Sequence, residues 1–311
     1  MKPSIAIENW APEYGSPLQH ATFEPTDATV DLDVEVPQKD WQPISPAQEI
    51  KPAERLIFID GVRRIEALVW ISSSPQTTRQ GICASFAAGV VEIGERAKIN
   101  NIEVGRGIFS AVDIEPLSTR ARIFEPIKVA GEEIEQLTMA LQRSLGELEI
   151  KIAESLKVEA ELIVVDGPLT GRQKVPGAIG YVKSHRVTYL PDTLSDIPGK
   201  LRPGERTPIF LSTTTWTRYS WYMRLPGPMS HPWSGIVRLE AAGELKVAEV
   251  QRLADLSAVT LPKYASVPHK DPRAPQNLFP IAGLERELRH RLGESSFVQR
   301  ALRQVASTGE S

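Results

Sequence analysis

Leu56-Ile57-Phe58-Ile59-Asp60-Gly61 is the stretch that decides the fold. Its four leading residues are apolar and two of them are β-branched, which predicts a strand buried on both faces of a sheet. The apolar run stops on a carboxylate followed by a glycine. The same pattern returns as Leu162-Ile163-Val164-Val165-Asp166-Gly167. The sequence therefore predicts two buried strands that each place an aspartate at the rim of a sheet.

The longest helical pattern lies between these two strands, from Gly131 to about Lys157. Its apolar face is formed by Ile134, Leu137, Leu141, Leu145, Leu148, Ile152 and Leu156. A helix in this position is expected to cross back and set the second strand parallel to the first. We therefore expect Asp60 and Asp166 to be neighbours at one edge of the sheet.

The remaining segments predict an α/β fold, a mixed sheet flanked by helices. Before the long helix, strands are expected at 56–60, 65–71 and 81–93, with turns at Arg63-Arg64 and Ser73-Ser74-Pro75 and an extended stretch at 102–114. After it, strands are expected at 180–185, 216–225 and 235–240, and helices at 244–258 and 281–305.

Residues 1–54 differ from the rest of the chain, 55–311, and are predicted to be a proline-rich arm. They contain eight prolines, which break helices and central strands, and their net charge is −7 against +4 for the remainder. Residues 30–36 read as a half-exposed edge strand, and Trp10 and Trp41 are expected to pin the arm to the body. Two interpretations stay open: the arm binds a partner or the body, or it is a solvated tail.

Composition excludes several classes of site. Cys83 is the only cysteine, so an internal disulfide and a cysteine-rich zinc site are excluded. The five histidines show no metal-ligand spacing, and there is no glycine-rich phosphate loop and no Gly-x-Ser-x-Gly elbow. The absence of a long apolar run and of a signal-peptide layout predicts a cytoplasmic protein without a membrane partner.

Two neighbouring carboxylates at a sheet edge predict a metal site, because hard divalent cations prefer oxygen ligands. A third ligand is expected from the long helix, where Glu149 lies at the margin of the apolar face and Glu147 points away. Such a set usually binds magnesium or manganese and serves phosphodiester hydrolysis. Lys183 is expected to stabilise the developing negative charge. The structural alternatives are that each Asp-Gly is an ordinary turn and that Lys183 is a solvated strand residue.

Several motifs together resemble the NurA nucleases, a branch of the ribonuclease-H-like fold. The two Asp-Gly strands are similar to that family's acidic motifs, and three later segments follow in its order. These are Gly180-Tyr181-Val182-Lys183, Ser220-Trp221-Tyr222-Met223-Arg224-Leu225 and Gly235-Ile236-Val237-Arg238-Leu239-Glu240. The resemblance runs from about Leu56 to the C-terminal helix.

This resemblance implies a manganese-dependent (or magnesium-dependent) DNA nuclease, acting as a 5′ to 3′ exonuclease and single-strand endonuclease. It implies a homodimer that works with a HerA-type hexameric ATPase in DNA end processing, repair or defence. By the same likeness Asp60, Glu149 and Asp166 hold metal, and Tyr222 and Lys183 assist. In the last motif the family's metal-site histidine is replaced by Glu285, which implies an altered oxygen ligand or a loss of activity.

Two functions of different classes are therefore carried forward. One is a metal-dependent nuclease, and the other is a non-cutting adaptor that docks DNA or a translocase. The arginines of the last helix are predicted either to touch phosphates or to form a solvated face; they are Arg286, Arg289, Arg291, Arg300 and Arg303.

Overall fold

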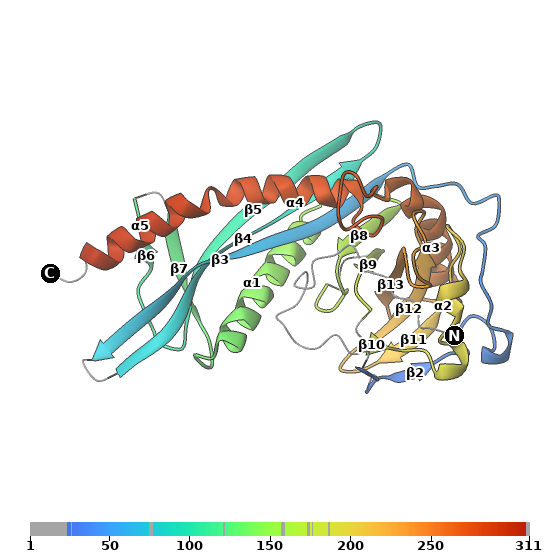
Figure 1. Cartoon of the computed structure of the whole chain (residues 1–311), viewed down its shortest axis with the longest axis horizontal. Helices are drawn as coiled ribbons and strands as arrows, with labels where there is room; N and C mark the ends of the chain where they lie inside the picture. The colour runs from blue at the N-terminus through green and yellow to red at the C-terminus, as the bar shows by residue number, and fades with distance from the viewer. Residues whose placement is uncertain are drawn as a thin grey trace. The chain divides into compact units, whose positions relative to one another are not determined.

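The fold is taken from a computed structural model, which describes residues 24–308 except 26, 75–76, 121, 157–158, 173–174, 176 and 186 (Figure 1). Residues 1–23 and 26 of the predicted arm, Trp10 among them, lie outside the described residues, as do Pro75 and Lys157. The chain divides into two compact units. Unit 1 comprises the described residues of 1–58, 92–97 and 158–282, and unit 2 those of 59–91, 98–157 and 283–311.

Unit 1 is built on a mixed sheet whose central strands are buried on both faces. The strand order is β2 (Thr29–Asp31), β11 (Phe210–Thr213), β12 (Thr217–Arg224), β13 (Ile236–Ala242), β9 (Ala178–Val182), β8 (Leu162–Asp166) and the start of β3 (Leu56–Ser74). Strands β8 and β9 are parallel, whereas the pairs from β9 to β2 are antiparallel. Since β9 and β13 are buried along their full length, their mainly apolar sequences fit central positions.

Helices and short elements complete unit 1. They are α2 (Ile197–Lys200), α3 (Val247–Thr260), the start of α4 (Phe279–Leu292), the 3-10 turns Gln38–Asp40, Asp192–Leu194 and Leu261–Tyr264, and a small parallel pair of β1 (Glu24–Pro25) with β10 (Val187–Thr188). The segment 27–54 is part of this unit, and Trp41 anchors it there. Its ring packs in a core cluster with Phe210 and Tyr222, and its Nε1–H donates to the carbonyl of Leu32 at 2.9 Å. The prediction that Trp41 anchors this segment is confirmed.

Unit 2 contains the rest of strand β3 and a second set of strands. The order is β3, β4 (Thr77–Ile93), β5 (Ala97–Ser110), β7 (Ile123–Lys128) and β6 (Leu117–Ser118), and the helices are α1 (Ile134–Glu154), the rest of α4, and α5 (Ser295–Thr308). Helix α5 packs Val298 and Leu302 against Cys83, which is fully buried as predicted. Burial raises the pKa of that thiol to about 12, so it is unreactive.

Several predicted boundaries were wrong. No turn occurs at Arg63-Arg64, because β3 is continuous over 19 residues and Arg64 is used inside it, where it binds Glu66 through two hydrogen bonds. The single helix expected at 281–305 is two helices, because Gly293 adopts a φ of +83° that an α-helix does not allow. Lys183 follows the end of β9 rather than standing in the middle of a strand.

Other boundaries shifted without changing the order of elements. The long helix is confirmed as α1, which begins at Ile134. The stretch expected at 102–114 is β5, and the edge strand expected at 30–36 is reduced to β2, at the edge of the sheet. Strand β11 was not predicted. Among the described helices none has an apolar stretch long enough to cross a membrane.

A buried ion pair ties residue Glu35 to the body of unit 1. Arg206 is 2% exposed, and its guanidinium binds both carboxylate oxygens of Glu35 at 2.7 and 2.8 Å and Asp255 at 2.7 Å. The backbone N–H of Ile209 also donates to Glu35 at 2.8 Å. Burial alone would raise the pKa of Glu35, but the hydrogen bonds and charge of Arg206 outweigh it and hold that pKa below its ordinary 4.5.

Glu35→Gln is therefore expected to lower the free energy of unfolding at pH 7 by about 1.5–3 kcal/mol, the range for a hydrogen bond to a charged group. Because the folded-state pKa is lowered, this contribution is present above the ordinary pKa and is lost as the pH falls through the folded-state value. Urea unfolding at pH 7 and pH 3 measures the difference, which should shrink at pH 3. Glu49→Gln, an exposed carboxylate of the same segment, is the control. Equal unfolding of Glu35→Gln and wild type at pH 7 would make the segment a passive tail.

Candidate metal centre

Asp166 ends strand β8 and is held by the tight turn that follows it. Gly167 has a φ of +89°, and its N–H donates to the carbonyl of Tyr181 at 2.8 Å. Two residues later the N–H of Leu169 donates to a carboxylate oxygen of Glu240 at 2.8 Å. A Cβ at Gly180 would lie 2.8 Å from the Leu169 nitrogen, so the glycine lets the turn fold closely over β9. The Asp-Gly pattern is thus a turn and a means of fixing the aspartate at once.

Lys183 binds Asp166 directly. Its Nζ lies 2.8 Å from an Asp166 carboxylate oxygen and 3.0 Å from the side-chain oxygen of Asn277. The Asn277 amide in turn donates to Asp271 at 2.6 Å. Burial opposes the charge of Asp271, but the hydrogen bonds from Asn277 and Arg273 outweigh it and lower the pKa of that carboxyl. Asp271, Asn277, Lys183 and Asp166 therefore form one chain of charged and polar contacts.

Tyr181, on β9, is the strand partner of Asp166 in the parallel pair of β8 and β9. Its hydroxyl donates to the backbone carbonyl of Gln276 at 2.6 Å, which fixes the loop that carries Asn277. Burial, and then the charge of Asp166, raise the pKa of Tyr181 well above its ordinary value. This hydroxyl therefore stays protonated and acts as a donor.

Asp60, Asp166 and Glu285 are brought together by the fold. Each offers one carboxylate oxygen, and these oxygens all lie within 4.8 Å of one another. Asp60 is 5% exposed and Glu285 7% exposed, and the N–H of Gly61 donates to Asp60 at 2.7 Å.

The donor set of these three residues fits a divalent metal ion. Two oxygens bound to one cation at about 2.0–2.6 Å lie at most about 5 Å apart, which matches the observed spacing. Three carboxylates at this distance, two buried and one half-buried, repel one another, and Lys183 supplies one positive charge beside Asp166. A hard cation relieves the remaining repulsion and satisfies oxygen ligands, whereas soft metals would require the sulfur ligands that are missing here.

Glu149 lies beside this group but is not one of the three. It is 3% exposed on α1, and its Oε1 lies 2.7 Å from the position that a Cβ would take at Gly61. The glycine after Asp60 therefore makes room for the Glu149 side chain. As expected from the helical pattern, Glu149 is buried and Glu147 is exposed.

Tyr222 is placed in a hydrophobic cluster. Its ring stacks on Phe210 at 6.0 Å and meets Trp233 edge-on at 5.7 Å. Burial raises the pKa of Tyr222 to about 12. The described contacts of this tyrosine connect it to the core of unit 1 and not to the carboxylates, so its expected role as an assisting residue has no geometric support.

Asn277, Asp271 and Glu240 were missed as site residues. Asn277 and Asp271 lie in a proline-rich loop that is far along the chain from Asp60 and Asp166. Glu240 ends a predicted strand, and nothing in the sequence around it indicates that it accepts a hydrogen bond from Leu169. The Pro-Gln-Asn run before α4 was the one local signal, since an asparagine in such a loop offers both a donor and an acceptor.

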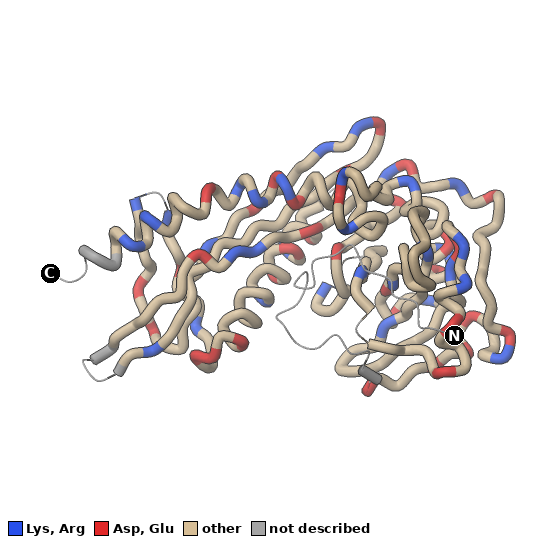
Figure 2. The backbone as a smooth tube through the Cα atoms, in the orientation of Figure 1, with Lys and Arg blue, Asp and Glu red and all other residues tan. Residues whose placement is uncertain are grey.

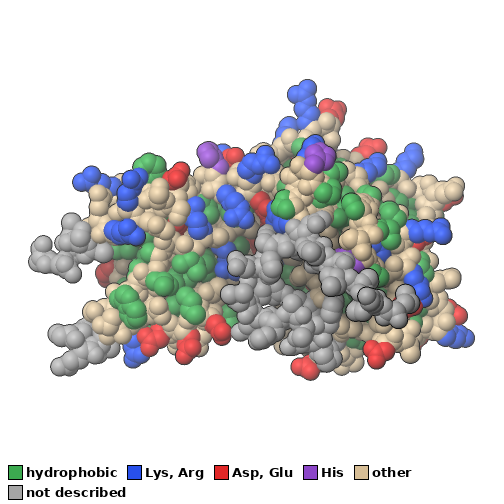
Figure 3. All heavy atoms as spheres, viewed as in Figure 1, with side chains coloured by type: hydrophobic (Ala, Val, Ile, Leu, Met, Phe, Trp, Pro, Cys, Tyr) green, Lys and Arg blue, Asp and Glu red, His purple; other side chains and the backbone are tan. Residues whose placement is uncertain are grey.

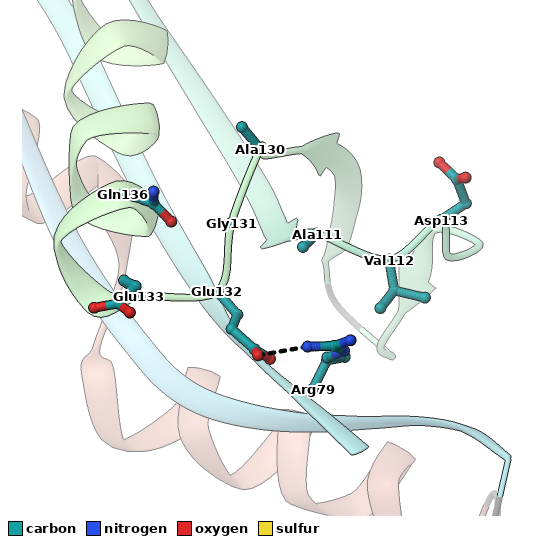
Figure 4. Close-up of a pocket in the computed structure, with 9 residues that line it drawn as sticks. All are labelled: Arg79, Ala111, Val112, Asp113, Ala130, Gly131, Glu132, Glu133 and Gln136. Carbon is teal, nitrogen blue, oxygen red and sulfur yellow. Dashed lines mark hydrogen bonds and ion pairs between the residues drawn. The ribbon is translucent and has the colours of Figure 1, made fainter. Parts of the chain in front are cut away.

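A hollow of about 710 Å³ lies elsewhere in unit 2, around the start of α1 (Figure 4). An ion pair of 2.7 Å between Arg79 and Glu132 crosses its wall, and both side chains are largely exposed. Its lining residues are Arg79, Ala111, Val112, Asp113, Ala130, Gly131, Glu132, Glu133 and Gln136. None of the predicted site residues lines it, and its charged groups are already paired or point to solvent.

Basic side chains follow α4 and α5, as the blue segments of these helices in Figure 2 show. Arg291 forms an ion pair with Glu287 at 2.7 Å, and Arg300 covers the ring of Phe297 at 4.5 Å. Their predicted contact with phosphates stays a prediction.

No protein-family model and no curated protein matches this sequence.

Proposed function

We propose that this protein is a divalent-metal-dependent nuclease that hydrolyses DNA. The observation that carries the proposal is the meeting of Asp60, Asp166 and Glu285 within 4.8 Å. The resemblance of the surrounding motifs to the NurA nucleases adds the reaction class and the substrate. By the same resemblance we propose manganese as the ion, a ribonuclease-H-like fold, and the 5′ to 3′ exonuclease and single-strand endonuclease activities.

The roles of the residues follow from their contacts. Asp60, Asp166 and Glu285 would hold the ion, which when bound supplies Lewis-acid stabilisation of the phosphodiester oxygens. Lys183 binds and orients the Asp166 carboxylate, and Asn277 holds the lysine through its side-chain oxygen. Glu240 holds the turn after Asp166 through the N–H of Leu169. Burial of Asp60 and Glu285 limits the access of bulk water, which strengthens each charge interaction in the site.

The partners are proposed from the exposed apolar residues of unit 2 and from the resemblance to the NurA nucleases. Hydrophobic side chains gather on the left of the visible face in Figure 3, and the exposed large apolar residues of unit 2 include Leu68, Trp70 and Phe297. Exposed apolar groups of this size favour association with another protein surface. We propose a homodimer that acts with a HerA-type hexameric ATPase in DNA end processing, repair or defence.

Incubation of the purified protein with labelled single-stranded and duplex DNA tests the proposal. Cleavage is expected with manganese and to a lesser degree with magnesium, and none is expected with EDTA. The products on a sequencing gel give the polarity. Binding of DNA without cleavage under all metal conditions would contradict the nuclease and leave the adaptor, which keeps the docking surfaces without the chemistry.

A further inference from the structure

Four side chains of unit 1 form a ladder in which aromatic rings and guanidinium groups alternate. The guanidinium of Arg218 lies 5.3 Å from the ring of Trp216 and 5.5 Å from that of Tyr189. The guanidinium of Arg238 lies 4.6 Å from the ring of Tyr189. The Arg218 guanidinium also donates to the Tyr189 hydroxyl at 2.9 Å. The ladder therefore runs in the order Trp216, Arg218, Tyr189, Arg238.

The ladder carries an excess of positive charge. Glu240 forms ion pairs with both arginines, at 3.1 Å from Arg218 and 2.6 Å from Arg238, and only the shorter contact is a hydrogen bond in the described residues. One carboxylate thus faces two guanidinium groups, and the described ion pairs of these arginines include no second acid. Aromatic rings interleaved with cations are typical of sites that bind single-stranded nucleic acid. Both arginines are buried here, so they supply positive charge behind the rings and not direct contacts with phosphates.

Trp216 is the end of the ladder that reaches the surface. It lies at the tip of the β11–β12 hairpin beside the exposed residues Thr214 and Thr215, and its ring is partly exposed. The hydrophobic cluster of this region takes in Trp41, Tyr189 and Trp233, but Trp216 is not among its described members. Trp216 is half-buried, with the guanidinium of Arg218 over its ring, so part of a flat aromatic surface stays open to solvent.

The same ring is tied to the turn that positions Asp166. The indole N–H of Trp216 donates to the Thr170 hydroxyl at 3.1 Å. Thr170 follows Asp166 by four residues, a stretch that spans at most about 14 Å when fully extended. The half-buried ring on the β11–β12 hairpin is therefore joined by one hydrogen bond to the turn that follows Asp166.

We infer that Trp216 is a stacking platform for a base of single-stranded DNA, with the charge of Arg218 behind it. This rests on the proposed nuclease function and adds to it the residue that would hold a base of the unpaired strand near the turn that follows Asp166. In a duplex the base faces are already stacked on one another, so the platform acts on single strands, frayed ends and gaps. Trp216 is a binding residue and not a catalytic one.

Binding of fluorescein-labelled oligo-dT in EDTA, where no cleavage occurs, tests the inference. Trp216→Ala is expected to weaken binding by about 5- to 150-fold, the range for loss of one base–aromatic stack, and to change binding of blunt duplex by less than about threefold. Trp216→Phe keeps a ring and should bind close to wild type. Met139→Ala, which removes an exposed apolar side chain from α1, is the control and should leave binding unchanged.

Two further measurements separate stacking from support of the loop. Thr170→Val removes the hydrogen bond and leaves the ring, so it should bind as wild type does; equal weakening by Thr170→Val, Trp216→Phe and Trp216→Ala would show a structural brace and overturn the inference. An oligonucleotide with one abasic site, moved along the strand, should lose affinity at one position for wild type and at none for Trp216→Ala. Thermal unfolding midpoints confirm that each variant is folded.

The outcome also distinguishes this inference from the proposed function. If the wild-type protein cuts DNA with manganese but Trp216→Ala binds single strands as tightly as wild type does, the stacking platform is wrong and the nuclease stands. If the wild-type protein neither binds nor cuts DNA under any metal condition, the proposed function fails and the platform fails with it.

Discussion

Asp60→Asn is expected to lower manganese-dependent DNA cleavage by at least about 100-fold, since a ligand to a catalytic metal contributes several kcal/mol to transition-state stabilisation. Asparagine has nearly the same shape and keeps an oxygen that accepts from the N–H of Gly61. It removes one of three negative charges that lie within 4.8 Å of one another. The metal-free variant should therefore be as stable as wild type or more so, because repulsion among the carboxylates falls.

Metal binding gives this prediction a readout besides activity. Manganese should raise the thermal midpoint of the wild-type protein, because a ligand that binds the folded state alone stabilises it by mass action. Asp60→Asn and Glu285→Gln should lose most of that rise. Asp113→Asn and Glu287→Gln are matched controls, since Asp113 is an exposed carboxylate paired with Lys128 and Glu287 lies on the same helix as Glu285. If the Asp60→Asn protein cleaves DNA and responds to manganese as wild type does, the proposed metal site is wrong.

Glu240→Ala is expected to lower the free energy of unfolding by about 3–5 kcal/mol, the usual cost of removing one partner from a buried ion pair. Glu240 is 1% exposed, and it binds Arg218, Arg238 and the N–H of Leu169. Its loss leaves two buried guanidinium groups without their counter-charge and the Leu169 N–H without its acceptor. The turn after Asp166 then loses its support, so cleavage should fall as well.

Urea unfolding in metal-free buffer measures the effect. Glu240→Gln should fall between wild type and Glu240→Ala, because the amide can still accept hydrogen bonds but carries no charge. Glu244→Ala, an exposed residue nearby in the sequence, should change the free energy of unfolding by less than about 0.5 kcal/mol. A loss of less than about 1 kcal/mol in Glu240→Ala would mean that water or other groups compensate the two arginines.

Local pattern was sufficient for the elements that carry the two aspartates. Apolar runs ending in Asp-Gly predicted β3 and β8, and a helical repeat predicted α1 with Glu149 at the edge of its buried face. Such patterns are legible because the period of apolar residues directly reports which side of a strand or helix is buried. The turn predicted at Arg63-Arg64 was wrong for the same reason, because two charged residues interrupt the apolar pattern. In the structure Arg64 donates hydrogen bonds to Glu66 and to the carbonyl of Gly293.

The third carboxylate of the group could not be fixed from pattern alone. Glu285 was named as a candidate only through the resemblance, and its neighbour Glu287 on the same helix has the same chemistry. Which of the two turns inward depends on how α4 lies against the strands, and Glu285 is buried whereas Glu287 forms an exposed-side ion pair. The partners of Asp166 were hidden likewise, because Lys183 and Asn277 are separated from each other by 94 residues.

The amino-acid sequence by itself determined where the buried strands and the long helix lie and that β8 ends in an aspartate, because these features depend on neighbours a few residues apart. The end predicted at Asp60 was wrong, because β3 continues to Ser74. Only the tertiary structure decided which distant side chains complete the site: Glu285 beside the aspartates, Asn277 behind Lys183, and Glu240 under the turn of Leu169. The physical reason is that a buried charge is tolerated only where a partner meets it, and such partners come from any part of the chain that packing brings within about 3 Å.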